Sequence, residues 1–301
     1  MIREIKITNY TNETKTLYLN RPETSGFAIE KIDGLGPIKA NIITTNIANL
    51  DGALFNSSHA NYRNIVFSIY FISIPTIERA RLESYRWFPL KQKLKISVKT
   101  DSRECECIGY VESNEPNIFS KGEKTTISII CPDPYLYSVI EKEVKFSGVL
   151  SSFEFPFSNE STDDPLIILG NFESKKREAI QYTGDFEVGI NIHIHLLGSV
   201  GDITLYHTNV NKSLKINVSK ITSLTGEALK AGDDIYINTK NGEKSIKLLR
   251  NGNYINILNS LDRNPNWFQL KKGNNEIAFT AESGEENIQL EITYKDAYEG
   301  V

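Results

Sequence analysis

Short runs of alternating apolar and polar residues recur along almost the whole chain, and they constrain its fold more than any other feature. They include NIVFSIYFIS, LKISVKT, EVGINIHIHLLG and IQLEITY, with Gly, Asn, Asp and Pro between them. Successive side chains of a strand point to opposite faces, so this alternation is typical of β-strands with one buried face. Asn241-Gly242 and Asn251-Gly252 lie between such runs and favour tight hairpin turns. The pattern predicts an all-β protein of sandwich type.

One segment, PTIERARLESYRWFP, breaks the alternation. Its apolar and small residues recur every three or four positions between Pro75 and Pro89. Proline is favoured in the first helical turn and stops a helix beyond its end. We therefore predict a single helix from Thr76 to Trp87. The residues expected on one face of it are Ile77, Ala80, Ser84, Tyr85 and Phe88.

A length of 301 residues allows two domains of ordinary size. The best boundary follows the segment CPDPYLYS, where Pro132 and Pro134 each remove a backbone donor. A new β pattern then begins with EKEVKFSG. We expect a first domain at residues 1–138, which contains the helix, and a second at residues 139–301.

The net charge of −4 gives no case for a specific nucleic-acid-binding protein. Residues 1–138 carry 17 basic and 15 acidic residues, a net charge of +2. The N-terminal run alternates charged and apolar residues, whereas a signal peptide needs an unbroken apolar core. No apolar run is long enough to cross a bilayer. We expect a soluble protein that is made in a cytoplasm and does not insert into a membrane.

The three cysteines, Cys105, Cys107 and Cys131, are too few and odd in number for a disulfide framework. A zinc site usually needs four nitrogen or sulfur ligands, and no second pair has the spacing of a zinc finger. Small buried thiols are the better interpretation. The motifs of nucleophile elbows, phosphate-binding loops, zinc proteases and EF-hands are also missing. We expect no catalytic residues, no cofactor and no metal ion.

Two weaker metal signals remain. His193 and His195, in NIHIHLLG, would project from one face of a strand, and His207 could approach as a third ligand. This spacing alone is a weak metal signal, and two histidines on the polar face of a half-buried strand are the preferred interpretation. Asp163 and Asp164, in STDDP, could hint at calcium, although carboxylates also favour turns before proline.

The segment WFQLKKGNNEIAF, residues 267–279, places two aromatic residues before a Gly-Asn-Asn cluster. We predict a tight turn at Gly273–Asn275 between two strands, with a positive φ at the glycine. Neighbouring residues of an extended chain point to opposite sides, so only one of Trp267 and Phe268 can be central. We assign the central position to the tryptophan. The predicted core residues of this segment are Trp267, Leu270 and Gly273.

An exposed aromatic platform is the alternative interpretation of the same region. Tyr254, Trp267 and Phe268 could together offer aromatic rings to a sugar, with polar groups beside them. Burial is the more common fate of a tryptophan, so sugar binding stays the alternative hypothesis.

Three stretches carry a resemblance to a known family. Residues 30–71 contain Gly34, Gly36 and Ala40, followed by Asp51, Gly52 and Ala53. Residues 109–138 contain a Gly-Tyr-Val strand and a Cys-Pro-Asp-Pro-Tyr exit. Residues 231–277 contain Gly232-Asp233, Asn251-Gly252, Trp267, and Leu270, Gly273 and Asn275 in the pattern L-x-x-G-x-N. In this order the three stretches resemble the distal tail protein (Dit) family of long-tailed bacteriophages.

The resemblance implies a structural role at the tip of the virion tail, for a protein synthesised in the cytoplasm of the host cell. Such proteins form a six-fold ring at the far end of the tail tube. The first domain builds the ring and its bore, and the second is a galectin-like or carbohydrate-module-like sandwich. The ring joins the tube protein to the tail-tip hub or tail-associated protein, and often to receptor-binding proteins. DNA passes through the bore without specific binding.

A closed ring needs two different contact patches on each subunit. We expect one patch on the helix and the other on the loop Asp51–Tyr62. The candidate contact residues of the helix are Thr76, Ile77, Arg79, Arg81 and Trp87. The competing hypothesis is a receptor-recognition protein that binds glycans through its C-terminal sandwich.

Overall fold

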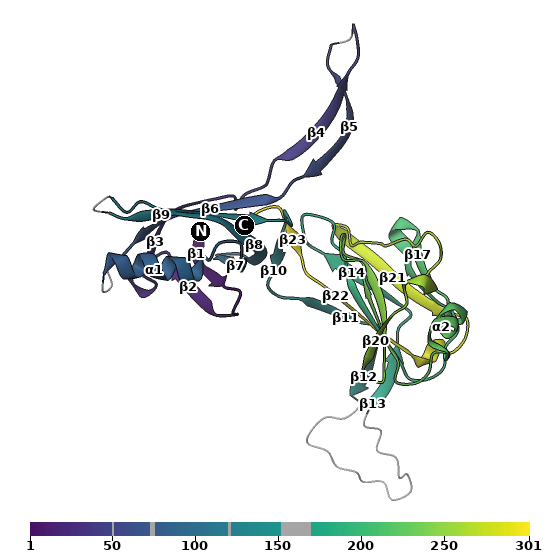
Figure 1. Ribbon diagram of the computed structural model, residues 1–301. Helices are drawn as coiled ribbons and strands as arrows, with labels where there is room; N and C mark the ends of the chain where they lie inside the picture. Colours follow the sequence, from purple (N-terminus) through teal and green to yellow (C-terminus); the bar gives the residue numbers. More distant parts are fainter. Residues whose placement is uncertain (50, 73–75, 120–121, 152–169) are drawn as a thin grey trace, which may run out of the picture. The chain divides into compact units, whose positions relative to one another are not determined.

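The chain forms two compact units in the computed structural model (Figure 1), which describes residues 1–301 except 50, 73–75, 120–121 and 152–169. Unit 1 consists of Met1–Ile140 and Ala297–Val301, and unit 2 is Glu141–Asp296. Antiparallel strands dominate both units, which confirms the all-β prediction. The last five residues return to unit 1, whereas the sequence placed them in the second domain.

Unit 1 is built on one nine-stranded antiparallel sheet. Its strands are β1 (Ile2–Thr8), β2 (Thr14–Tyr18), β3 (Phe27–Asp33), β6 (Arg63–Phe71), β7 (Lys93–Thr100), β8 (Glu104–Pro116), β9 (Lys124–Cys131), β10 (Leu136–Ser138) and β23 (Ala297–Tyr298). The main path runs β2-β1-β7-β8-β9-β6-β3, and β10 pairs with both β8 and β23. The two ends of this path, β2 and β3, contact each other beside the short 3-10 helix η1 (Pro22–Thr24). The sheet is therefore strongly curled around its buried face.

The core of unit 1 lies on the inner face of this curled sheet. In β6 every second residue is buried, from Arg63 through Ile65, Phe67 and Ile69 to Phe71. The other strands of the sheet add mainly Ile, Leu, Val and Cys side chains in the same alternation. A period of two along each strand is what allows one sheet to bury a continuous apolar surface.

The predicted helix is present as α1 (Ile77–Trp87), and Thr76 is its N-cap. The Thr76 side chain accepts a hydrogen bond from the backbone N–H of Arg79 at 3.2 Å, which satisfies a free donor of the first turn. Ala80, Ser84 and Trp87 face the core, as the spacing requires. Tyr85 was predicted on this face, but it is exposed. Pro75 lies outside the described residues.

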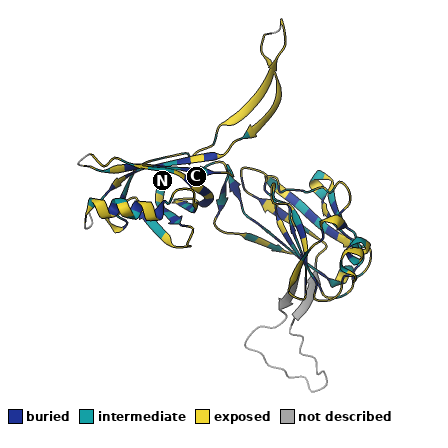
Figure 2. Cartoon of the chain, in the orientation of Figure 1, coloured by how far each residue is buried: buried dark blue, intermediate teal, exposed yellow. Residues whose placement is uncertain are grey.

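A second, two-stranded sheet of unit 1 consists of β4 (Ala40–Asn46) and β5 (Ala53–Ala60). We call its described residues between 40 and 60 the arm hairpin. All its strand residues are exposed except Ala60, which is half-buried, as the yellow colour in Figure 2 shows. The predicted contact loop Asp51–Tyr62 is thus mainly the strand β5.

Unit 2 contains two larger sheets and a small one. The larger sheets have the strand orders β11-β22-β15-β18-β19-β20 and β14-β21-β16-β17, and the small one pairs β12 with β13. The strands are β11 (Lys142–Lys145), β12 (Ser147–Ser151), β13 (Gly170–Ser174), β14 (Arg177–Tyr182), β15 (Asn191–Leu196), β16 (Ile203–His207), β17 (Lys212–Ile216), β18 (Asp234–Asn238), β19 (Ser245–Arg250), β20 (Asn253–Asn256), β21 (Gly273–Ala281) and β22 (Ile288–Tyr294). Three 3-10 helices are η2 (Thr208–Val210), η3 (Leu258–Ser260) and η4 (Glu285–Asn287).

The two larger sheets of unit 2 pack face to face. The ring of Phe146, which follows β11, lies 6.1 Å from that of Phe279 in β21. Tyr182 in β14 and Tyr294 in β22 are 6.0 Å apart between ring centroids. These contacts join opposite sheets, so unit 2 is a β-sandwich with its core between them.

A second helix, α2 (Val218–Thr225), was not predicted. Its residues are rich in Val, Ile, Ser and Thr, which have modest helix propensity and look like the end of the preceding strand. Its caps define it instead: the Asn217 side chain accepts from the N–H of Lys220, and Gly226 ends the helix with a φ of 80°. Glycine is favoured at this left-handed position because it has no Cβ.

The structure corrects the prediction for Trp267. Phe268 is fully buried, whereas Trp267 is only half-buried, so the phenylalanine takes the single central position. Leu270 is fully buried, as predicted. Gly273 has the predicted positive φ, 101°, but it begins β21. Asn275 is therefore a strand residue, and no turn lies at Gly273–Asn275.

Candidate functional site

The arm hairpin has the properties of an unpaired assembly element. Its large apolar side chains are highly exposed, with exposed fractions of 61% for Ile42, 56% for Leu54 and 65% for Phe55. Among the described residues, β4 and β5 pair only with each other. A lone two-stranded hairpin is at best marginally stable in water. Both observations indicate a partner surface for this hairpin.

The strands of the arm hairpin also carry no charged residue. Their sequences are ANIITTN and ALFNSSHA, without Lys, Arg, Asp or Glu. Edge strands of soluble proteins are usually protected by charges, prolines or bulges, because a free edge pairs readily with another chain. The register shifts once, between Ile43 and Thr44, and is otherwise regular. The free edges are thus largely open to pairing.

Only some of the predicted contact residues of helix α1 are exposed. Trp87 is buried, and Ile77 packs against the core of unit 1. Arg81 is held by Glu123, with nitrogen–oxygen distances of 3.1 and 3.3 Å. Arg79 is exposed, and so is the N-cap Thr76. The other large exposed apolar side chains of this helix are Leu82 and Tyr85.

Arg63 is the largest fully buried side chain of unit 1, and the sequence analysis missed it. It stands in phase with the apolar residues of β6, which is the signal that could have indicated its burial. Its guanidinium donates to backbone carbonyls of three separate segments. The donor–acceptor distances are 2.5 Å to Gly34, 2.8 Å to Gly36, 2.7 Å to Pro134 and 2.7 Å to Glu299.

The Arg63 contacts explain why Gly34 occurs in residues 30–71, the first of the three stretches that resemble the Dit family. Gly34 has a φ of 85°, and a Cβ at this position would lie 1.9 Å from the carbonyl oxygen of Asn64. Only glycine fits there. The same arginine holds the C-terminal segment through Glu299, and the N–H of Val301 donates to Leu35 at 3.1 Å. Arg63 therefore joins the beginning, middle and end of unit 1.

Cys105, Cys107 and Cys131 are all buried, and none of them forms a disulfide. The sulfur atoms of Cys107 and Cys131 are 3.9 Å apart. The hydrogen bond between them raises the pKa of Cys107 well above its ordinary value and lowers that of Cys131. This hydrogen-bonded pair fits the expected role of the cysteines as small core side chains.

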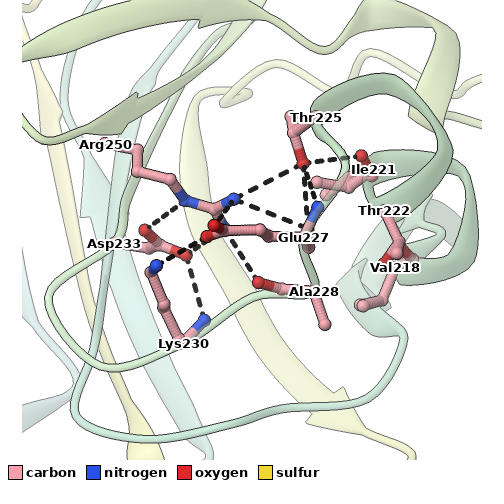
Figure 3. Close-up of polar contacts among 9 residues, drawn as sticks. All are labelled: Val218, Ile221, Thr222, Thr225, Glu227, Ala228, Lys230, Asp233 and Arg250. Atoms are coloured by element: carbon pink, nitrogen blue, oxygen red, sulfur yellow. Dashed lines mark hydrogen bonds and ion pairs between the residues drawn. The ribbon is translucent and has the colours of Figure 1, made fainter.

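Unit 2 contains a second buried arginine, Arg250, at the end of β19 (Figure 3). It forms a bidentate ion pair with Asp233, with distances of 2.8 Å from Nε to Oδ1 and 2.5 Å from Nη2 to Oδ2. Nη2 also donates to the carbonyl of Ala228 at 2.9 Å. The Asp233 carboxylate accepts a further bond from the N–H of Lys230 at 3.0 Å.

This ion pair organises the loop after α2. Next to it, Glu227 forms an ion pair with Lys230, with a distance of 2.6 Å between Oε2 and Nζ (Figure 3). The hydrogen bond to Asp233 raises the pKa of Arg250, so the guanidinium stays charged at neutral pH. Asp233, which belongs to the third stretch that resembles the Dit family, is thus one partner of a structural ion pair. Sequence reasoning had no local signal for Arg250, because its partner lies 17 residues away.

His193 and His195, the predicted metal candidates, both hydrogen-bond to one oxygen of Asp234. The distances to Oδ1 are 2.9 Å from His193 Nε2 and 2.7 Å from His195 Nδ1. Burial acts to raise the pKa of Asp234, but the hydrogen bonds from the two imidazoles outweigh it and lower the pKa. The carboxylate is therefore ionised at neutral pH.

The remaining metal candidates do not join this group. His207 is fully buried and lies beside the Phe268 ring, 5.7 Å between centroids. Asp163 and Asp164 lie outside the described residues. Within the described part of the chain, no group of three or more His, Cys, Asp or Glu side chains could hold a metal ion. The same part contains no helix long and apolar enough to cross a membrane.

The three residues of the predicted sugar platform have different environments. Phe268 is buried and Trp267 is half-buried, whereas Tyr254 is exposed on the outer face of the six-stranded sheet. The aromatic neighbour of Tyr254 is Tyr236, at 5.9 Å between ring centroids. Tyr236 was not singled out from the sequence, although it lies two residues from Asp234 on an alternating strand.

Comparison with known proteins finds a family model that matches most of unit 2 and solved structures that share the fold of nearly the whole chain. The family model of the siphovirus-type tail component, C-terminal domain (SPP1_Dit), matches residues 183–298. No curated protein matches this chain. The crystal structure of the SPP1 Dit protein, described as a paradigm of the hub adsorption apparatus in phages infecting Gram-positive bacteria, has a similar fold. Its TM-score is 0.64 at 14% identity, over 97% of this chain and 98% of that chain.

Two further similar structures belong to the baseplate of phage p2 in its activated conformation. The one with Sr has a TM-score of 0.50 at 10% identity, over 98% of both chains. The one with Ca has a TM-score of 0.50 at 11% identity, over 100% of both chains. At such identities the likeness concerns the fold, whereas the family match rests on the sequence of unit 2. Residues 183–298 therefore resemble the C-terminal domain of the siphovirus-type tail component family, and nearly the whole chain has a fold similar to that of the SPP1 Dit protein.

Proposed function

We propose that this chain is a non-catalytic structural protein of the phage tail tip, where copies of unit 1 close a ring, most simply of six. The arm hairpin is the observation that carries the proposal. Its two strands are uncharged, exposed and unpaired at their outer edges among the described residues. Such a hairpin gains stability when a neighbouring subunit covers its apolar side chains.

A ring closes when one patch of each subunit meets a different patch of the next subunit. The arm hairpin is the first patch in this proposal. The second is the outer face of α1, where Leu82 and Tyr85 are exposed beside Arg79. The arrangement revises the predicted contact set, because Ile77 and Trp87 already pack within their own subunit.

The proposed ring connects the tail tube protein to the tail-tip hub or tail-associated protein, and it offers attachment points for receptor-binding proteins. The family match and the fold shared with the SPP1 hub protein support this position. The net charge of +2 over residues 1–138 fits a bore that passes DNA without retaining it. Synthesis in the host cytoplasm and assembly at the virion tail tip complete the proposal.

Removal of the arm hairpin tests the ring directly. Ala40 and Ala60 are paired, so a two-residue Asn-Gly turn can replace residues 41–59 without changing the nine-stranded sheet. We expect rings for the full chain and monomers for the shortened chain, by native mass spectrometry and negative-stain electron microscopy at high protein concentration.

Single substitutions sharpen the test. Phe55→Asp places a charge in the exposed apolar surface of the arm and is expected to prevent ring formation with little effect on subunit folding. Ser102→Asp, an exposed position in the turn after β7, is the matched control and should leave rings intact. A full chain that stays monomeric at high concentration and forms no ring in virions would refute the proposal, as would rings that persist without the arm.

A further inference from the structure

The outer face of the six-stranded sheet in unit 2 carries a group of side chains that ring formation does not use. His193 and His195 come from β15, Asp234 and Tyr236 from β18, and Tyr254 from β20. Antiparallel pairing sets His193 opposite Tyr236 and His195 opposite Asp234. The residues between them on each of β15 and β18 are buried in the sandwich core. We call these five residues the outer-face cluster.

The aromatic rings of the cluster support one another. The rings of His193 and Tyr236 are stacked, with centroids 4.6 Å apart and an interplanar angle of 3°. Tyr254 lies next to Tyr236 at 5.9 Å, tilted by 59°, and 64% of it is exposed. Aromatic rings fixed in this way combine flat apolar surface with polar edges.

The polar atoms of the cluster are mainly hydrogen-bond acceptors. His193 donates through Nε2 and His195 through Nδ1 to the same oxygen of Asp234. In a neutral imidazole the other ring nitrogen is then an acceptor. The second carboxylate oxygen of Asp234 is a further acceptor, and it has no hydrogen bond among the described residues. Three acceptors thus lie beside two tyrosine rings.

We propose that the outer-face cluster binds a neutral saccharide. The C–H face of a pyranose ring packs on Tyr254, and its hydroxyl groups donate to the acceptors of Asp234, His193 and His195. An anionic ligand fits poorly because the central group is an ionised carboxylate. The flanking charges also balance. Lys247 in β19 lies opposite Tyr236, and Glu291 in β22 lies opposite His193.

This recognition role goes beyond the structural role of the ring. It needs only the fold of unit 2, so a single copy is expected to bind. Where copies assemble as proposed above, several clusters share one particle, and binding to a surface that carries many saccharides becomes tighter without new contacts.

The probe is the purified full chain on an array of immobilised oligosaccharides of glucose, galactose, N-acetylglucosamine and rhamnose. The free form of the best-bound saccharide is then titrated by nuclear magnetic resonance. Tyr254→Ala and Asp234→Asn are each expected to weaken binding about tenfold or more, as loss of a stacking ring or a paired acceptor would. Tyr206→Ala is the matched control, because this tyrosine is exposed on β16 of the other sheet.

Binding by the full chain that Tyr254→Ala and Asp234→Asn weaken, and Tyr206→Ala leaves within twofold, would support the proposal. It is overturned if the full chain binds no saccharide of the array, or if Tyr206→Ala weakens binding as much as Tyr254→Ala. Circular dichroism of each variant excludes unfolding as the cause. Electron microscopy of the same samples keeps the two proposals apart, because rings without saccharide binding reject only this site, and saccharide binding by monomers rejects only the ring.

Discussion

Unit 1 and unit 2 each bury one arginine, and they satisfy it in opposite ways. Arg63 donates to four backbone carbonyls, and none of the described ion pairs includes it. Arg250 forms a bidentate ion pair with Asp233 and adds the carbonyl of Ala228. Burial lowers the pKa of Arg63, whereas the bond to Asp233 raises that of Arg250.

The difference follows from what each arginine holds in place. The partners of Arg63 lie up to 236 residues away and include the returning C-terminal segment. The partners of Arg250 all lie within 25 residues, in the last residue of α2 and the loop that follows it. A guanidinium has five donors in a rigid plane, so it can join several chain segments that have only carbonyls to offer. Arg63 is thus a link across unit 1, and Arg250 is a local loop anchor.

Arg63→Met should give the largest effect. The substitution removes the buried guanidinium and leaves four backbone carbonyl groups without this donor, and each such lost bond costs free energy. We expect the free energy of unfolding of unit 1 to fall by about 3–5 kcal/mol, together with proteolysis of the C-terminal segment. Chemical denaturation and limited proteolysis measure both effects. Arg86→Met, at an exposed arginine of α1, is the control and should change stability by less than about 1 kcal/mol.

The proposed difference between the two arginines fails if Arg63→Met destabilises unit 1 while the C-terminal segment stays protected from protease. Arg63 would then be a local packing residue like Arg250. Equal loss of unit 2 in the same variant would contradict the division of the chain into two units.

Asp233→Asn should give an intermediate effect, confined to unit 2. The side chain keeps its shape but leaves the buried Arg250 without its counter-charge, which we expect to cost about 3 kcal/mol. Combining it with Arg250→Met should cost clearly less than the sum of the single substitutions, since the double variant has no unpaired charge. Denaturation of the four proteins measures the coupling, with the exposed Asp262→Asn as control. If the losses of unfolding free energy in the two single variants simply add up in the double variant, the ion pair itself does not stabilise unit 2.

Mild acid should give the smallest effect and should again separate the units. Burial lowers the pKa of His207 in unit 2, although its contact with Asn275 partly opposes this. The unfolded chain, with a histidine pKa of about 6.5, therefore binds the proton more readily than the folded chain. Stability is full above that value and falls as the pH drops from it towards the folded pKa.

The measurement is the melting temperature of each unit at about pH 7.5 and about pH 5, which lie above and below the unfolded histidine pKa of about 6.5. Unit 2 should melt earlier in acid, and His207→Gln should remove part of this dependence. The described histidine of unit 1, His59, is exposed, so unit 1 is the internal comparison. An unchanged pH dependence in His207→Gln would assign the acid sensitivity to other groups.

The sequence predicted helices and strands better than it predicted which distant residues contact one another. The helix between Pro75 and Pro89 was predictable because its spacing and N-cap lie within one continuous segment. Helix α2 was missed because its β-branched composition resembles a strand, and only its caps at Asn217 and Gly226 distinguish it. The sequence predicted a contact region at Asp51–Tyr62, and this stays a prediction; that most of the region is one strand of a separate, uncharged hairpin emerged only from the strand pairing.

The sequence by itself determined the all-β class, the position of α1, the positive φ at Gly273 and the rule that only one of Trp267 and Phe268 is central. These properties depend on local periodicity and backbone conformation. The tertiary structure decided that Phe268 is the buried one, that Arg63 holds the C-terminal segment, and that Tyr254 lies beside Tyr236. Alternation states which neighbours share a face, but only pairing with distant strands determines which face is buried and which side chains meet on it.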